Sequence, residues 1–206
     1  MKWHIGVCAI VCGLGSVAGA AFATDFQLYL LAGQSNMDGY GKIDELPPEL
    51  NRVQKGVWIY HADMPGDGEK LGGQGMWEEL RPGHGRGFTS DGKSNRYSDR
   101  FGIELSFADE MQKLRPNEPI ALLKCSRGGT SIDPEVARWY GCWDPDFADP
   151  SVRDKPLYNQ YDHFLAALRR ATAVCDINGD GEDDRLIPAG IVWMQGESEA
   201  TKETSA

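Results

Sequence analysis

Basic residues are scarce in this sequence relative to acidic ones. The 206 residues include 21 Lys and Arg against 31 Asp and Glu, which gives a formal net charge of -10 at pH 7. A surplus of negative charge repels phosphate backbones, so the composition argues against a nucleic-acid partner. It sets no limit on binding a neutral polysaccharide. A chain of this length is expected to fold as one domain with a sizeable core.

Long apolar runs are missing beyond the first 23 residues, so no membrane span is expected there. At the start, Lys2 precedes a small and apolar stretch over 5–18, and an Ala-Phe-Ala sequence ends at Ala23. This pattern predicts a signal peptide over 1–23 with cleavage near Ala23. The mature chain, 24–206, is then secreted or periplasmic and is not held in a membrane. An anchoring helix is the alternative interpretation of the same segment.

Cysteine is also sparse. Cys8 and Cys12 belong to the predicted signal peptide, which leaves Cys125, Cys142 and Cys175. Export permits disulfides, but an odd number leaves at least one thiol without a partner in the chain. Cys125 ends an apolar run and is predicted to be a buried small hydrophobe. Cys142 and Cys175 are a possible bridge.

Short apolar runs predict strands that are buried on both faces of a sheet. They cover residues 26–31, 57–60, 120–124 and 186–194, and helical spacing is found over 101–115 and 158–174. This order predicts an α/β fold, a three-layer α/β/α sandwich with a central, mainly parallel sheet. The buried stripe of the second helix is predicted to contain Tyr161, Leu165, Leu168 and Thr172.

Two stretches, 61–100 and 131–156, have no strand or helix period and are predicted to be irregular loops. Both are rich in aromatic residues. These rings either line a sugar-binding rim, because flat aromatic faces pack on apolar sugar faces, or pin the loops to the core. The residues concerned are Trp77, Phe88, Tyr97, Trp139, Tyr140 and Trp143.

The first apolar run ends in the turn Gly33-Gln34-Ser35-Asn36-Met37. A serine just past a buried strand lies at the carboxyl edge of the sheet, where open α/β folds place their ligands. Ser35 is therefore a candidate nucleophile, although it could instead cap the following helix. Polar turns at 128–130 and 195–197 follow two other strands, so a parallel sheet would bring all three turns to one edge.

The turn at 33–37 resembles the first block of the SGNH hydrolases, in the form found in sialate O-acetylesterase domains and in the acetylxylan esterases of carbohydrate esterase family 6. Residues 193–199, Trp-Met-Gln-Gly-Glu-Ser-Glu, are similar to the Gln-Gly-Glu block of that group. The resemblance implies the flavodoxin-like SGNH fold. It also implies a serine esterase that removes acetyl groups from acetylxylan or O-acetylated sialic acid without a cofactor. The family's last segment is not covered, so the chain is expected to be C-terminally incomplete.

By this resemblance, Ser35 attacks the ester and its backbone N–H is one oxyanion donor. Residues 101–105 match the family's second block, which makes the N–H of Gly102 a second donor, although Gly102 could merely ease entry into a helix. The Gln195 side chain would be a third donor. Glu197 either orients the catalytic histidine or holds the loops together, and Glu199 is predicted to be solvated. The neighbouring residues predicted to contact substrate are Gln34, Asn36, Gly129 and Thr130.

The family's catalytic histidine lies in an Asp-x-x-His motif, which the sequence 1–206 does not contain. Of the histidines present after residue 23, His163 is predicted to cover the outer face of a helix. His84 lies in a glycine-rich loop that could reach the site, and His61 follows a strand. An incomplete chain is the simplest explanation. The alternative is a non-catalytic, carbohydrate-binding relative.

The acidic segment 176–184 has metal spacing. Oxygen-bearing side chains at its first, third and fifth positions, followed by a glycine, match the first half of a calcium loop. The twelfth position is Ile187 rather than Glu, so Asp183 or Asp184 would have to close the site. An acidic surface turn is the other interpretation. The predicted ligands of a structural calcium ion are Asp176, Asn178, Asp180 and Glu182.

Overall fold

The computed structural model describes residues 23–63, 72–137, 140–147 and 159–201, so the predicted signal peptide and Trp139 lie outside the described residues. A five-stranded sheet has the order β4-β3-β8-β1-β9. Four of its strands are parallel, and β4 pairs antiparallel at one edge. The strands are β1 (Asp25–Gly33), β3 (Val57–His61), β4 (Trp77–Glu79), β8 (Ile120–Ser126) and β9 (Arg185–Met194).

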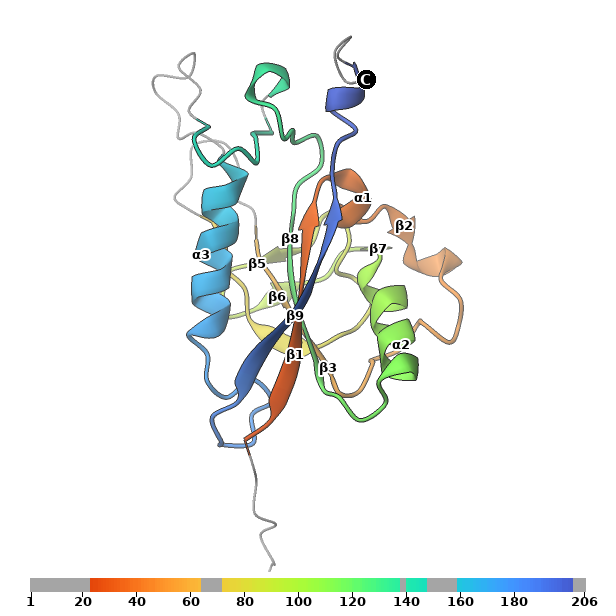
Figure 1. Cartoon of the computed structure of the whole chain (residues 1–206). Helices are drawn as coiled ribbons and strands as arrows, with labels where there is room; N and C mark the ends of the chain where they lie inside the picture. Colours follow the sequence, from red (N-terminus) through yellow and green to blue (C-terminus); the bar gives the residue numbers. More distant parts are fainter. Residues whose placement is uncertain (1–22, 64–71, 138–139, 148–158, 202–206) are drawn as a thin grey trace, which may run out of the picture.

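Two helices cover opposite faces of the sheet, α2 (Glu104–Leu114) and α3 (Gln160–Thr172) (Figure 1). Successive side chains of β1 point to opposite faces of the sheet, so the strand contributes to the core on both faces. Leu28 and Ala32 pack with the alanines of α3, whereas Tyr29 and Leu31 pack with Leu105 of α2. Every residue of β8 is buried, as its continuous apolar sequence predicts. The three-layer α/β/α arrangement is therefore confirmed.

The predicted buried stripe of α3 is only partly correct, because Leu168 packs against the core whereas Tyr161 and Thr172 are exposed. His163, Ala167 and Ala171 face the interior, and Tyr161 is 37% exposed. Small side chains allow the helix to lie close to its neighbours. A methyl group added at Gly73 would lie only 2.6 Å from the backbone nitrogen of Ala167, which shows how closely the incoming chain approaches the helix there. His163, predicted to cover the outer face, is instead 4% exposed, and its Nδ1 accepts the backbone N–H of Gly72 at 2.9 Å.

The stretch 61–100 was predicted to be irregular, but it contains short strands. Besides β4, it contains the small antiparallel pair of β5 with β6 and the first residue of β7, which pairs antiparallel with β2 from before the stretch. Trp77 pins this stretch to the core, because it is buried and its indole N–H donates to the Ala171 carbonyl at 3.0 Å. The bounds are β2 (Gly41–Lys42), β5 (Thr89–Ser90), β6 (Asn95–Arg96) and β7 (Arg100–Phe101), and 3₁₀ turns occupy Ile43–Glu45, Pro134–Val136 and Glu199–Thr201.

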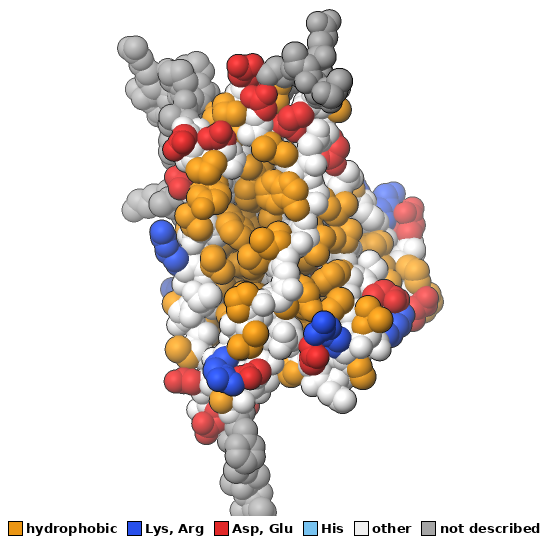
Figure 2. Space-filling view, viewed as in Figure 1, with side chains coloured by type: hydrophobic (Ala, Val, Ile, Leu, Met, Phe, Trp, Pro, Cys, Tyr) orange, Lys and Arg blue, Asp and Glu red, His pale blue; other side chains and the backbone are white. Residues whose placement is uncertain are grey.

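Strand β9 forms the other edge of the sheet. Within the described part of the chain it pairs with β1 alone. Several of its apolar side chains are exposed, including Ile191 at 67% and Trp193 at 45%. Figure 2 shows hydrophobic side chains gathered on the face of the molecule along which β9 runs.

None of the three cysteines after residue 23 forms a disulfide. Cys125 and Cys142 are buried and Cys175 is exposed, so the possible bridge between Cys142 and Cys175 is not formed. The prediction that Cys125 is a buried small hydrophobe is confirmed, because it lies in a core cluster. None of the helices in the described residues has the length and apolar character that crossing a membrane requires.

Candidate active site

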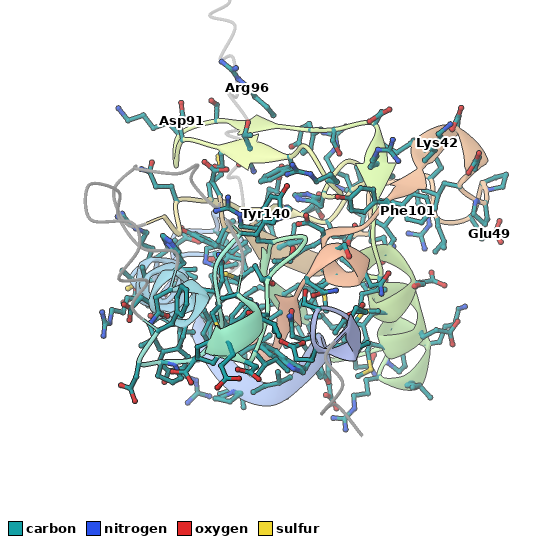
Figure 3. The ribbon with its side chains drawn as sticks, turned by 90° about the horizontal axis from the view of Figure 1, so that it is seen from above. Lys42, Glu49, Asp91, Arg96, Phe101 and Tyr140 are labelled. Atoms are coloured by element: carbon teal, nitrogen blue, oxygen red, sulfur yellow. The ribbon has the colours of Figure 1, made fainter. Side chains whose placement is uncertain are left out.

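Ser35 begins α1 (Ser35–Asp38), a single helical turn directly after β1. Gln34 is the N-cap of this turn and no side chain caps it, so the interpretation of Ser35 as a cap is wrong. The half-buried Ser35 lines a cavity of about 460 Å³ at the carboxyl end of the parallel strands. Figure 3 looks onto this end of the sheet, with Tyr140, another cavity residue, near the middle of the view.

The three predicted turns meet beside Ser35. The backbone N–H of Gln34 donates to the Met194 carbonyl at 2.9 Å, and that of Arg127 donates to the Gly33 carbonyl at 3.1 Å. These bonds tie the end of β1 to the ends of β9 and β8. The parallel register predicted from the apolar runs is thus what assembles the site.

Gln195 connects the same three turns through its side chain. Its amide Nε2 donates to the Thr130 carbonyl at 2.7 Å and to the Gln34 side-chain oxygen at 3.1 Å. Ser198 donates its hydroxyl to the same two acceptors. Both protons of the Gln195 amide are therefore engaged in bracing the turns, and an oxyanion would have to displace one acceptor.

The other predicted polar residues take part in similar bonds. Thr130 is fully buried, and its hydroxyl donates to the Arg127 carbonyl at 2.9 Å. Asn36 is exposed and donates its amide to the Glu197 carboxylate, which joins the start of α1 to the turn after β9. The prediction that Glu199 is solvated is wrong. One of its carboxylate oxygens accepts the N–H groups of Ile132 and Asp133 at 2.6 and 3.2 Å.

Gly102 lies at the far end of α1 rather than in the cavity lining. Its N–H donates to Oε1 of Glu104 at 2.8 Å. A methyl group added at Gly39, the residue after α1, would lie 2.4 Å from the Gly102 Cα. Its role as an oxyanion donor stays a prediction, because the structure engages its proton elsewhere.

A buried ion pair fixes this region. Lys124 and Glu104 are both fully buried and are 2.7 Å apart. The Lys124 ammonium also donates to the backbone carbonyls of Asp38 and His84, at 3.1 and 2.7 Å. Each proton of the ammonium has a partner, which is the condition for holding a charge in the interior. One side chain thus joins α1, the loop at residue 84 and the start of α2.

Asp38 is a site residue that the sequence reasoning missed. It lies three residues after Ser35 on the same helical turn and also lines the cavity. Its carboxylate accepts the Ser126 hydroxyl at 2.9 Å and the Gly128 N–H at 3.2 Å. Burial raises its pKa, against the lowering effect of the Ser126 hydrogen bond. The spacing from Ser35 is the signal that could have identified it.

Gly128 lies directly against Ser35. A methyl group added at Gly128 would lie 3.5 Å from the Ser35 Cβ. The next residue, Gly129, has a φ of +80°, and a side chain there would strike the Tyr140 ring. Glycines at both positions therefore allow the backbone of this turn to approach the serine closely.

Two histidines lie at the cavity wall opposite the turn after β1. His61 ends β3, lines the cavity and is 6% exposed. His84 is fully buried behind it, with the two Nδ1 atoms 3.4 Å apart. Burial holds the pKa of His61 well below its usual value and lowers the pKa of His84 to about 3, with the Lys124 charge adding to both effects. Both rings are therefore neutral at neutral pH.

The acidic loop at 176–184 is held by its own backbone. The Asp176 carboxylate accepts three loop N–H groups, those of Gly179, Asp180 and Gly181. Asp184 accepts the N–H groups of Thr24 and Ile177 at 3.1 and 2.8 Å. Among the described residues, no group of three or more His, Cys, Asp or Glu side chains is arranged to hold a metal ion.

Comparison with known proteins places these residues in context. Residues 25–206 match a protein family described as carbohydrate esterase, sialic acid-specific acetylesterase. A comparison with curated proteins gave no match. Among solved structures, a protein from Arabidopsis thaliana is 18% identical, with a TM-score of 0.49, over 84% of this chain and 58% of its own.

Two further structures are similar in the same way. A carbohydrate acetylesterase from Xanthomonas citri is 14% identical, with a TM-score of 0.46, over 86% of this chain and 34% of its own. NanS is 16% identical, with a TM-score of 0.46, over 89% of this chain and 58% of its own. The chain thus spans between one third and three fifths of the length of these structures.

Proposed function

The chain belongs to the carbohydrate esterase family described as sialic acid-specific acetylesterase, and from this premise we propose that it hydrolyses O-acetyl esters of a carbohydrate with Ser35 as nucleophile. The observation that carries the proposal is the position of Ser35. It stands at the carboxyl edge of a parallel sheet, beside a glycine turn and on the wall of a 460 Å³ cavity. No cofactor is needed for this chemistry.

The reaction proceeds in two steps. The Ser35 oxygen attacks the acetyl carbonyl and a base takes the hydroxyl proton; the bond to the sugar oxygen then breaks, and that oxygen receives the proton from the base and leaves as an alcohol. Water then attacks the acetyl-serine and releases acetate. The family resemblance predicts that the base is the histidine of an Asp-x-x-His motif, which the sequence 1–206 does not contain.

The negative charge on the carbonyl oxygen needs N–H donors close to Ser35. The Ser35 N–H begins a helical turn, and the Gly128–Gly129 turn lies against the serine side chain. We assign the oxyanion site to the N–H groups of Ser35 and Gly129, because the N–H of Gly128 donates to Asp38. Gln195 contributes if its amide turns away from Gln34 or Thr130, and otherwise acts by holding the three turns together.

We propose an acidic sugar as substrate. Arg86 and Arg127 line the cavity together with Asp38 and Asp63, in a chain with a net charge of -10. Guanidinium groups bind carboxylates through paired N–H donors, as a sialic acid would require. Tyr140 adds an exposed aromatic face for the sugar ring. Acetylxylan, which has a neutral backbone, is the alternative substrate.

The test measures acetate release from O-acetylated sialic acid and from acetylated xylan. We expect Ser35→Ala to lose at least about 1,000-fold in kcat, as loss of a nucleophile does. Ser106→Ala, a serine on the exposed face of α2, is the matched control and should keep full activity. Equal activity of the Ser35→Ala protein would remove the serine from the mechanism. Faster release from xylan would contradict the acidic substrate.

A non-catalytic carbohydrate-binding role is the second candidate. It is favoured by one observation, the engagement of the Gln195 amide protons and the Gly102 N–H within the protein. Calorimetric titration with sialic acid decides between the two. Binding without any acetate release from the ester supports the binder.

Two further expectations belong to the proposal. Export with cleavage near Ala23 is tested by the N-terminal sequence of the mature protein. A calcium ion at Asp176, Asn178, Asp180 and Glu182 would raise the melting temperature, because a ligand that binds only the folded state stabilises it. Melting with calcium and with a chelator measures this, and equal midpoints would retire the calcium site.

A further inference from the structure

The buried histidine pair beside the cavity has no part in the chemistry described so far. His61 presents one ring edge to the cavity that contains Ser35. Its ring is stacked on Phe88 with centroids 4.1 Å apart and planes within 12°. Because its Nδ1 faces His84, the ring nitrogen left for the cavity is Nε2. Among the described residues, this nitrogen makes no hydrogen bond.

A carboxylate behind the pair favours one arrangement of the ring protons through its charge. Oε1 of Glu78, on β4, lies 3.4 Å from Nε2 of the fully buried His84, which is a charge contact without hydrogen-bond geometry. Glu78 also accepts hydrogen bonds from the Tyr97 hydroxyl and the Asn95 amide, so its carboxylate acts only as an acceptor toward the described residues around it. An imidazole nitrogen beside such an acceptor is most stable when it carries the proton.

The proton positions follow along the chain of groups. His84 is neutral, so a proton on Nε2 leaves its Nδ1 bare and able to accept. The Nδ1 of His61, 3.4 Å away, must then be the donor. His61 is also neutral, and its second nitrogen, Nε2, is left unprotonated. The cavity wall thus carries a hydrogen-bond acceptor that the charge of Glu78 favours through two rings.

We propose that His61 is a substrate-binding residue whose unprotonated Nε2 accepts a hydrogen bond from a hydroxyl group of the sugar that carries the acetyl ester. An unprotonated imidazole nitrogen accepts a hydrogen bond, and the most numerous hydrogen-bond donors of a sugar are its hydroxyl groups. Glu78 and His84 are positioning residues, because they act on the sugar only through the tautomer of His61. The inference rests on the proposed function, since it places the sugar in the cavity of Ser35.

The first experiment compares two esters. For His61→Phe we expect kcat/KM for O-acetylated sialic acid to fall about tenfold, the loss of one neutral hydrogen bond. The phenyl ring keeps the stacking on Phe88. For p-nitrophenyl acetate, which has no sugar hydroxyl, kcat/KM should stay within about twofold. Equal losses for both esters, or none for the sugar ester, would overturn the proposal. A wild-type protein inactive on both esters would instead count against ester hydrolysis by the chain 1–206, and the NMR measurement below would then test His61 by itself.

The second experiment needs no turnover and reads the tautomer directly. Nitrogen NMR of the Ser35→Ala protein should show an unprotonated Nε2 for His61, and this resonance should shift when O-acetylated sialic acid is added. A protonated Nε2, or a resonance indifferent to the sugar, overturns the proposal even if His61→Phe fails to fold.

A matched pair of variants tests the role of the carboxylate. Glu78→Gln should redistribute the proton of His61 and weaken binding of O-acetylated sialic acid several-fold, although Glu78 does not line the cavity. Glu79→Gln changes the next residue of β4, whose carboxylate pairs with Lys55, and should leave the tautomer and the binding unchanged. Identical His61 spectra in the two variants would exclude the assigned role of Glu78.

Discussion

The buried histidines make the stability of the protein depend on pH. His84 has a pKa of about 3 in the folded state against 6.5 when unfolded, and burial also lowers the pKa values of His61 and His163. Between these values the unfolded chain binds protons that the folded chain does not, so acid favours unfolding. Asp38, with a raised pKa, acts in the opposite direction.

We therefore expect the free energy of unfolding to fall as the pH drops below 6.5, by up to about 1.4 kcal/mol per pH unit for each histidine that stays neutral. The loss through His84 should level off near pH 3. Urea titrations at a series of pH values measure this. His84→Phe should flatten the curve, and a midpoint that is the same at pH 7 and at about pH 4 would contradict the prediction.

The buried ion pair at Lys124 gives a second prediction. Lys124→Met leaves the Glu104 carboxylate buried without its counter-charge and should cost about 3–5 kcal/mol. Lys124→Met with Glu104→Leu removes both charges and should recover a large part of that loss. Chemical denaturation of the two proteins measures the difference. A double variant less stable than the single one would show that the hydrogen bonds to Asp38, His84 and Gly102 matter more than the charge.

At the residue scale, the sequence identifies functional residues that directly follow a recognisable apolar run. Ser35 and Gln195 each end an apolar run, so their meeting follows from a parallel sheet. Asp38, His61 and Lys124 could not be assigned in this way, because their roles depend on partners 23 to 90 positions away. The sequence also could not predict that both amide protons of Gln195 are hydrogen-bonded, since their acceptors lie on two other turns.

At the scale of elements, the contact between β1 and the end of β9 depends on Gly33. Its φ is +147°, and a methyl group there would lie 2.0 Å from the Met194 carbonyl oxygen. We expect Gly33→Ala to cost about 1–3 kcal/mol from backbone strain alone and to separate Gln195 from Gln34. Thermal melting measures the first effect and acetate release the second. Gly190→Ala, where a methyl group meets only the Tyr29 ring at 3.4 Å, is the control and should be mild.

The elements that the sequence predicts are those with strong local signals. The runs that became β1, β3, β8 and β9 are continuous and apolar because both faces of these strands meet side chains in a three-layer fold. The short strands β4 to β7 have no such signal, since two or three residues are too few to show a period. In α3 the predicted stripe is rotated from the buried face, where Phe164 and Leu168 only flank the fully buried residues. The alanines, which allow close approach, are the ones that turn inward.

At the scale of the whole molecule, the apolar edge at β9 predicts self-association of the chain 1–206. An edge strand offers unpaired backbone groups, and here it also exposes Ile187, Ile191 and Trp193. We expect the sedimentation coefficient to rise with protein concentration, and Ile191→Lys to reduce that rise. Leu114→Lys, which changes a 73% exposed residue on α2, is the control and should have little effect. A protein that stays monomeric at every concentration would contradict the prediction.

The three thiols differ in burial, so their rates of alkylation report how different parts of the molecule open. Cys175 stands in solvent and will be alkylated at once, whereas burial raises the pKa of Cys125 to about 12 and removes the reactive thiolate. Cys142 is buried near the cavity, in a loop, with its thiol directed at the Ile132 carbonyl. Counting alkylated thiols over time by mass spectrometry would therefore give three rates. The rate for Cys175 reports surface exposure, the slower rate for Cys142 reports opening of its loop, and the slowest rate, for Cys125, reports unfolding of the central strand β8.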